Sequence, residues 1–209
     1  MQSSPDPAEV DQSKPVRPPG EVTGWLRQLP RGDLAGMSRV MRALYGDLRR
    51  IAAGRMRRER PNHTLDPDAL ISELFLQLAK NPVGQFENRG QFLAFASERM
   101  RRFLVDYARA RASQKRGGGW EKVDIENCSL AVRQDLDQLL IVDGLIEKLA
   151  DQEPRMAKVV EMRCFGGLAY SEIAEALGVT ERTAKRDWAF ARAWLQCELR
   201  KGISHGNDG

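Results

Sequence analysis

The strongest constraint on the fold is the spacing of apolar residues, which follows a helical period along most of the chain. Apolar side chains recur at three- and four-residue steps from Leu34 through Leu48 to Ile51, which predicts one amphipathic helix. Similar steps run from Leu70 to Leu78 and from Phe92 to Tyr107. No segment has the convincing alternation of a strand, so the sequence predicts an all-α fold.

Helix-capping and helix-breaking residues mark where these helices begin and end. Asp66-Pro67 combines a capping side chain with a proline in the first turn, and Asn81-Pro82 ends the same helix. A longer helix follows Gly90. Beyond residue 133 one helix carries Leu136 to Ile146, and another begins near Pro154 and ends at Gly166-Gly167.

Two polar segments divide the chain. The first twenty residues hold five prolines, and residues 114–132 are polar and contain the run Gly117–Gly119. We therefore predict two helical domains joined by a flexible linker. The expected boundaries are a disordered N-terminal tail at 1–20, a first domain at 21–113, the linker at 114–132, a second domain at 133–200 and a C-terminal tail at 201–209.

Composition argues against several classes of protein. With 30% charged residues and no apolar run of membrane length, we expect no stable membrane insertion and a cytoplasmic location. The cysteines at 128, 164 and 197 and the histidines at 63 and 205 are too scattered for a zinc site or a catalytic pair. Phosphate-binding glycine motifs are lacking as well. We predict no metal, no cofactor and no enzymatic activity.

Basic charge is concentrated in three segments, although the net charge is only +4. Residues 49–60 carry a net +5, residues 99–122 a net +6 and residues 181–201 a net +3. Arginine dominates, and its planar guanidinium suits phosphates and guanine edges. Each segment alone fits a solvated helix face, whereas three in one chain favour a nucleic-acid partner.

The segment Tyr170–Leu195 has the pattern of a helix-turn-helix. Ala174 is small where a second helix crosses, Gly178 supplies the turn and Thr180 can cap the next helix. Apolar residues continue the buried stripe to Leu195. The basic end of the second helix is left free for the major groove, with Arg182, Thr183, Lys185 and Arg186 as candidate contacts. The alternative is an ordinary helical hairpin.

The order of these motifs resembles the extracytoplasmic-function (ECF) sigma factors of bacterial RNA polymerase. DPDALISELFLQLAK looks like their region 2.2, GQFLAFASERMRRFLVDYARARASQKR like regions 2.3 and 2.4, and EIAEALGVTERTAKRDWAFARAWL like the region 4 helix-turn-helix. ERPNHTLDPDALISEL and RRFLVDYARARASQKRGGG are similar to a subgroup of ECF-like factors. The resemblance covers about residues 21–200 and implies a sigma region 2-like and a sigma region 4-like domain.

The resemblance also implies site residues. Region 2.2 of the family docks on the β′ clamp of core polymerase, and the matching positions here are Asp68, Ser72, Glu73 and Gln77. Ala69 and Ser72 depart from the acidic residue and the glutamine that are common at these positions. Contact with the −10 element would fall to residues of the loop and helix that follow: Phe86, Asn88, Arg89, Arg101, Arg102, Arg109 and Arg111. Contact with the −35 element would fall to Arg182, Thr183, Lys185 and Arg186, with Arg192 on phosphate.

The implied function is non-enzymatic: an alternative sigma factor that binds core polymerase at the β′ clamp and β flap, recognises promoter DNA and helps to open it. An anti-sigma factor is a further candidate partner. Three alternatives stay open at this stage. They are a stand-alone helix-turn-helix regulator, an enzyme built on Asp66, Asp68 and Glu73, and a protein-interaction adaptor.

Overall fold

The computed structural model of the chain describes residues 19–56, 66–81, 85–114 and 136–205, and every regular element in these ranges is helical. The N-terminal half contains α1 (Pro19–Gln28), α2 (Leu34–Ala43), α3 (Tyr45–Met56), α4 (Pro67–Lys80) and α5 (Arg89–Gln114). The C-terminal half contains α6 (Leu136–Gln152), α7 (Pro154–Val160), the π-helical turn η1 (Glu161–Phe165), α8 (Tyr170–Leu177) and α9 (Glu181–His205). The predicted all-α class is confirmed.

The capping signals act where the sequence predicts. The Asp66 carboxylate accepts a hydrogen bond of 3.4 Å from the N–H of Asp68, and Pro67 begins α4. Asn81 ends α4 with its N–H bonded to the Gln77 carbonyl.

The predicted single helix from Leu34 to Ile51 is wrong. It is divided at Leu44 into α2 and α3, and Leu44 has φ −97° and ψ 9°. Gly46 follows the break, and glycine favours the helix less than other residues do. The apolar stripe keeps its register across the break, because Met41, Leu44 and Leu48 are all buried.

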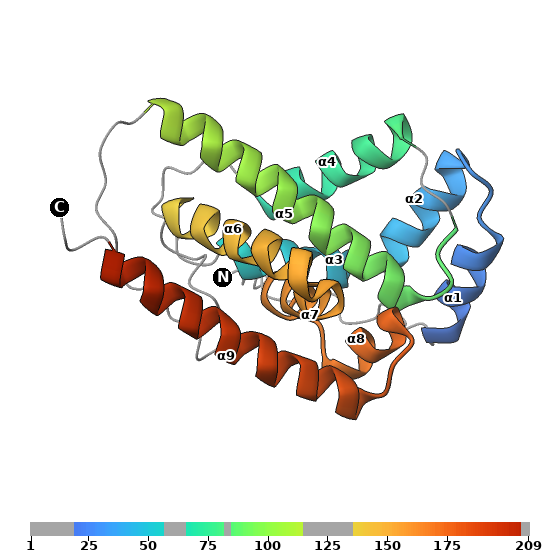
Figure 1. The fold of residues 1–209 in the computed structure, drawn as a ribbon. Coiled ribbons are helices and arrows are strands. Elements are labelled where there is room, and N and C mark those ends of the chain that lie inside the picture. Colours follow the sequence, from blue (N-terminus) through green and yellow to red (C-terminus); the bar gives the residue numbers. More distant parts are fainter. Residues whose placement is uncertain (1–18, 57–65, 82–84, 115–135, 206–209) are drawn as a thin grey trace, which may run out of the picture.

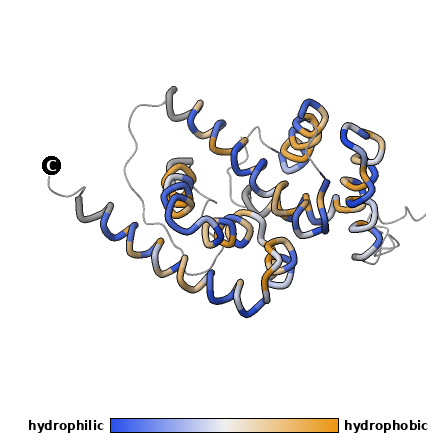
Figure 2. The backbone as a smooth tube through the Cα atoms, turned by 45° about the vertical axis from the view of Figure 1, so that its right-hand side comes forward, coloured by the Kyte–Doolittle hydropathy of each residue, from blue (hydrophilic) through white to orange (hydrophobic). Residues whose placement is uncertain are grey.

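The long helix α5 lies between the two halves of the chain (Figure 1). It contacts α1, α3 and α4 on one side and α6, η1 and α8 on the other. The buried residues form one continuous cluster that includes Leu48 and Leu74 of the first half and Leu139 and Ile173 of the second. Polar and apolar residues alternate around the helices, as expected of amphipathic elements (Figure 2).

The N-terminal tail and the linker at 114–132 fall almost wholly outside the described residues, as do residues 206–209 of the C-terminal tail. Residues 201–205, which the sequence analysis assigned to that tail, are described, and they continue helix α9 to His205. The division into two domains therefore stays a prediction, while the helices assigned to the two domains are packed against each other. Within the described ranges, no helix combines the length and apolarity needed to cross a bilayer.

The turn at Gly178 yields a stability prediction. Gly178 has φ +65° and open space where a Cβ would stand, so alanine there would meet backbone strain without a clash. We expect Gly178→Ala to lower the free energy of unfolding by about 1 kcal/mol. The control is Gly144→Ala on an exposed position of α6, which should raise it by about 0.5–1 kcal/mol because alanine favours the helix. Urea unfolding measures both, and equal effects of the two changes would contradict the turn argument.

Candidate nucleic-acid interface

Helices α8 and α9 form the predicted helix-turn-helix. Glu172 accepts a hydrogen bond of 2.8 Å from the N–H of Ala169 and so closes the first turn of α8. Gly178 ends α8 in the left-handed conformation, and the N–H of Val179 bonds to the Ala174 carbonyl. The Thr180 hydroxyl then accepts a hydrogen bond of 3.2 Å from the N–H of Thr183 and caps α9.

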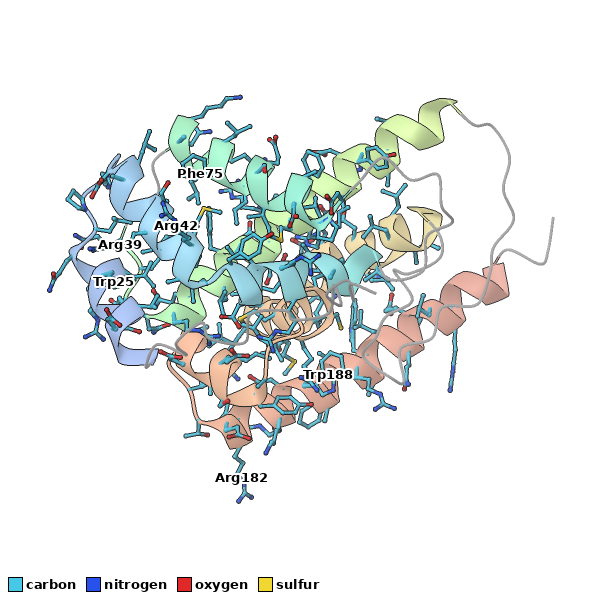
Figure 3. The ribbon with its side chains drawn as sticks, turned by 180° about the vertical axis from the view of Figure 1, so that it is seen from behind. Trp25, Arg39, Arg42, Phe75, Arg182 and Trp188 are labelled. Atoms are coloured by element: carbon cyan, nitrogen blue, oxygen red, sulfur yellow. The ribbon has the colours of Figure 1, made fainter. Side chains whose placement is uncertain are left out.

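The start of α9 presents a basic surface to solvent. Arg182, Lys185 and Arg186 are exposed, whereas Ala184, Trp188 and neighbouring apolar residues face the core. Figure 3 shows Arg182 projecting away from the molecule beside the bend between α8 and α9. This is the arrangement that a recognition helix needs, with a buried side for orientation and a free basic side for the major groove.

Two of the residues predicted for this surface are less available. The Thr183 hydroxyl lies 2.9 Å from that of Thr180, so Thr183 takes part in the cap. Arg192 is partly buried. Phe190 was missed by the sequence analysis, although it is 60% exposed and stands one turn after Arg186. Helical spacing alone places these two residues on one side of α9.

An ion pair between a buried carboxylate of α9 and an exposed arginine of α7 fixes the orientation of α9. Asp187 is 1% exposed and accepts two hydrogen bonds from Arg155 of α7, at 2.6 and 3.2 Å. A bidentate arginine defines the direction of the carboxylate as well as its distance. Sequence analysis counted Asp187 only as a charge opposing the basic cluster, because nothing local shows that its partner lies thirty-two residues earlier.

Helix α4 presents the second candidate surface, which we call the α4 face: Asp68, Ser72, Glu73, Leu76 and Gln77. Asp68 accepts a hydrogen bond of 2.6 Å from the Tyr45 hydroxyl, and this bond, with some help from burial, raises the pKa of Tyr45. Ser72 donates to the Asp68 carbonyl, and the Gln77 amide donates to Glu73 at 3.4 Å. Leu76, which the sequence analysis missed, is 48% exposed.

Four of the predicted −10 residues lie in a different environment, at the contact between the two halves. Arg101 is 7% exposed and pairs with Asp143 of α6 and with Glu161 of η1 at 2.7 Å. Arg109 also bonds Asp143, at 3.2 Å.

Two further residues of this set reach α8. Arg89 pairs with Glu172 at 2.6 Å and with Asp47 of α3 at 2.8 Å. The Asn88 amide donates to the Glu175 carbonyl at 3.1 Å. The structure therefore gathers four predicted DNA contacts, on α5 and just before it, against the C-terminal helices.

The remaining −10 residues divide three ways. Phe86 is 9% exposed and packs edge-on against Phe92, with ring centroids 5.2 Å apart, so in this conformation it belongs to the core. Arg102 is exposed and pairs with Glu98 one turn earlier. The side chain of Arg111 lies outside the described residues.

The carboxylates proposed for the alternative enzyme have structural positions. Asp66 caps α4, Asp68 binds Tyr45 and Glu73 accepts from Gln77. Across the described ranges, no three histidine, cysteine or acidic side chains are grouped so that they could hold a metal ion.

A family model described as ECF sigma factor matches residues 19–201, which is most of the chain and includes both halves. The chain belongs to the ECF sigma factor family. Family membership implies DNA binding and a role as an alternative sigma factor in transcription initiation. No curated protein and no solved structure matches the chain.

In this sigma factor, two arginines and a backbone N–H surround the carboxylate of Glu172. Burial alone would raise the pKa of its carboxyl group. The hydrogen bond from the Ala169 N–H, the ion pair with Arg89 and the charge of Arg50 outweigh burial and hold that pKa below its ordinary value of 4.5. Asp47 faces the same two arginines from α3.

Acid should therefore weaken this sigma factor through Glu172. A carboxyl group with a lowered pKa in the folded state contributes stability that is complete above its ordinary pKa and is lost as pH falls through the lowered value. We expect the free energy of unfolding, measured with urea, to fall less steeply below about pH 4.5 in Glu172→Gln than in the wild type. Glu175→Gln, on the same helix, is the control and should follow the wild type. Parallel profiles for Glu172→Gln and the wild type would contradict the prediction.

Proposed function

We propose that this ECF sigma factor binds core RNA polymerase through the α4 face and recognises promoter DNA through two separate basic surfaces. The basic N-terminal end of α9, with Arg182, Lys185 and Arg186, reads the −35 element. The arginines of α5 and the preceding loop contact the −10 element and help to open it. The protein supplies recognition, the polymerase performs the chemistry, and the place of action is the bacterial cytoplasm.

The observation that carries this proposal is the helix-turn-helix with its exposed basic end. Three cations lie on the free side of α9, and the Asp187–Arg155 ion pair holds the opposite side against α7. The side chains that meet DNA are thus already on a rigid element, and binding costs little ordering. Phosphate contacts then set the register, and base contacts from the first two turns give specificity.

The α4 face supports the polymerase contact. Asp68 and Ser72 are exposed, and Glu73 and Gln77 are half-buried. Leu70, Leu74 and Leu78 hold the other side of the helix in the core. An exposed apolar residue, Leu76, stands among them, and a partly apolar centre with a polar rim is usual for protein interfaces. By resemblance to the family, this is also the surface that would meet the β′ clamp.

A charge reversal on α4 tests the polymerase contact. We expect Glu73→Arg to abolish or strongly reduce transcription from promoter fragments with purified core polymerase of a matching host, because it places a cation in an acidic docking surface. The control is Glu21→Arg, an equal charge change on an exposed position of α1, which should leave initiation unchanged. DNA binding without initiation in the wild type would instead indicate a stand-alone helix-turn-helix regulator.

A truncation on α9 tests the −35 contact. We expect Arg186→Ala to weaken binding to the preferred duplex by about 1–3 kcal/mol, because a bidentate base contact would be lost. Binding to other sequences should weaken less. Arg31→Ala, an exposed arginine in the turn before α2, removes the same charge elsewhere and serves as the control. Titration at several salt concentrations separates contacts with phosphate from contacts with bases. An equal loss for all sequences would assign Arg186 to phosphate.

A further inference from the structure

Phe190 on α9 has the most exposed of the large apolar side chains in the part of the chain that the structure describes. Its exposed fraction is 60%, compared with 48% for Leu76 and 45% for Leu34. Exposure alone does not make a site, because single apolar residues are common on protein surfaces. The position of Phe190, directly after the basic end of α9, is the observation that points to a ligand.

The ring lies on the same outward side of α9 as the basic residues. At 3.6 residues per turn, Phe190 is rotated by about 40° from Arg186 and lies about 6 Å further along the helix. The buried residues Ala184, Ala191 and Leu195 define the opposite side. A ligand that lies along the helix at Arg186 therefore meets the Phe190 ring as well.

The surroundings of Phe190 leave its ring accessible. Ala189 and Ala193 are exposed, and their side chains end at Cβ, so they neither cover the ring nor hold a ligand away from the helix. Helix α9 packs mainly against α6, α7 and α8, which lie on one side of it (Figure 1). The edge of a base pair can therefore reach the ring without a rearrangement of neighbouring side chains.

The charge around Phe190 favours DNA over an apolar protein surface as the ligand. The exposed side chains from Arg182 to Cys197 carry three positive charges and no negative one. An apolar partner would remove these cations from water without pairing them, whereas DNA supplies phosphates and guanine edges. The major groove also presents one apolar group on the base edges, the 5-methyl group of thymine.

We propose that Phe190 contacts the 5-methyl group of a thymine in the duplex that α9 recognises and makes the protein prefer an A·T pair at that position. The inference rests on the proposed function, which places α9 in the major groove. The ring lies about 6 Å beyond Arg186, and successive bases of a strand are about 3.4 Å apart. The thymine therefore lies one or two base pairs from the base that Arg186 contacts.

The ring discriminates between base pairs in two ways. It covers the methyl group of thymine and so removes apolar surface from water. Against a G·C pair it faces the amino group of cytosine or the acceptors of guanine, and these groups lose water without gaining a hydrogen bond. A G·C pair at this position should therefore weaken binding more than removal of the methyl group alone.

The test removes the methyl group from the DNA and the ring from the protein, separately and together. The probe is a duplex that the full-length wild-type protein selects from a random-sequence pool. Copies of this duplex carry deoxyuridine in place of one thymine at a time, which removes the 5-methyl group and keeps the hydrogen bonds of the base pair. Fluorescence anisotropy gives the dissociation constant of each duplex.

We expect one replacement, within two base pairs of the position at which Arg186→Ala loses its preference, to weaken binding of the wild type about fourfold, as for one buried methyl group. Phe190→Ala should bind the unmodified duplex more weakly and should not respond to this replacement. Leu34→Ala on α2 is the matched control, because it truncates another exposed apolar side chain. It should keep the full dependence on the methyl group.

A wild-type protein that does not respond to any replacement would overturn the inference, and so would a methyl dependence that survives Phe190→Ala. A selected duplex without thymine in the expected interval would overturn it as well. Self-association that is lost in Phe190→Ala, measured by sedimentation in the absence of any methyl dependence, would assign the ring to a contact between two copies of the chain.

The same experiment keeps the two proposals apart. A selected duplex whose preference depends on Arg186, together with no effect of the methyl group, refutes the role of Phe190 alone. Failure of the protein to select any duplex from the pool refutes the proposed recognition of DNA by α9 and the inference together.

Discussion

A buried guanidinium group determines how the two halves of this protein meet. Arg101 enters the contact between α5, α6 and η1 with two carboxylates, Asp143 and Glu161. Burial alone would lower the pKa of Arg101, but the charges and hydrogen bonds of these carboxylates raise it, so the side chain stays protonated. A charge in this position permits few alternative arrangements, because any shift of α6 along α5 would leave it unpaired.

The apolar contacts around Arg101 are less selective. Phe92, Met100 and Leu139 belong to a continuous core, and apolar surfaces of similar size can slide or exchange with modest loss. The ion pairs therefore give the interface its register, and the apolar residues give it most of its free energy. The same division holds at α9, where burial of Trp188 contributes free energy and the ion pair of Asp187 fixes the orientation of the helix.

Local signals made much of the fold predictable. Caps and turns act through neighbours a few residues away, so Asp66-Pro67, Gly178 and Thr180 could be interpreted directly from the sequence. The helix-turn-helix and the exposure of Arg182 and Arg186 followed from one helical period. The break at Leu44 could not be recognised, because the apolar stripe continues through it in register.

Distant partners made the rest unpredictable. Arg101 looked like a surface cation because the acids that bury it lie 42 and 60 residues further along the chain. Phe86 was assigned to a base-contacting loop, while its place beside Phe92 depends on the packing of the whole first half. Patterns in sequence report which residues share a helix face, and they do not report which helix covers that face.

The Asp187–Arg155 ion pair has a consequence for how such a protein changes over evolutionary time. Orientation of α9 is set on its inner side, and the exposed residues of its first two turns contribute little to holding it. Those outer residues are free to vary while the scaffold stays intact. Under the proposed role of α9 in reading DNA, single substitutions there would change promoter preference, and a duplicated copy could diverge in what it reads without loss of the fold.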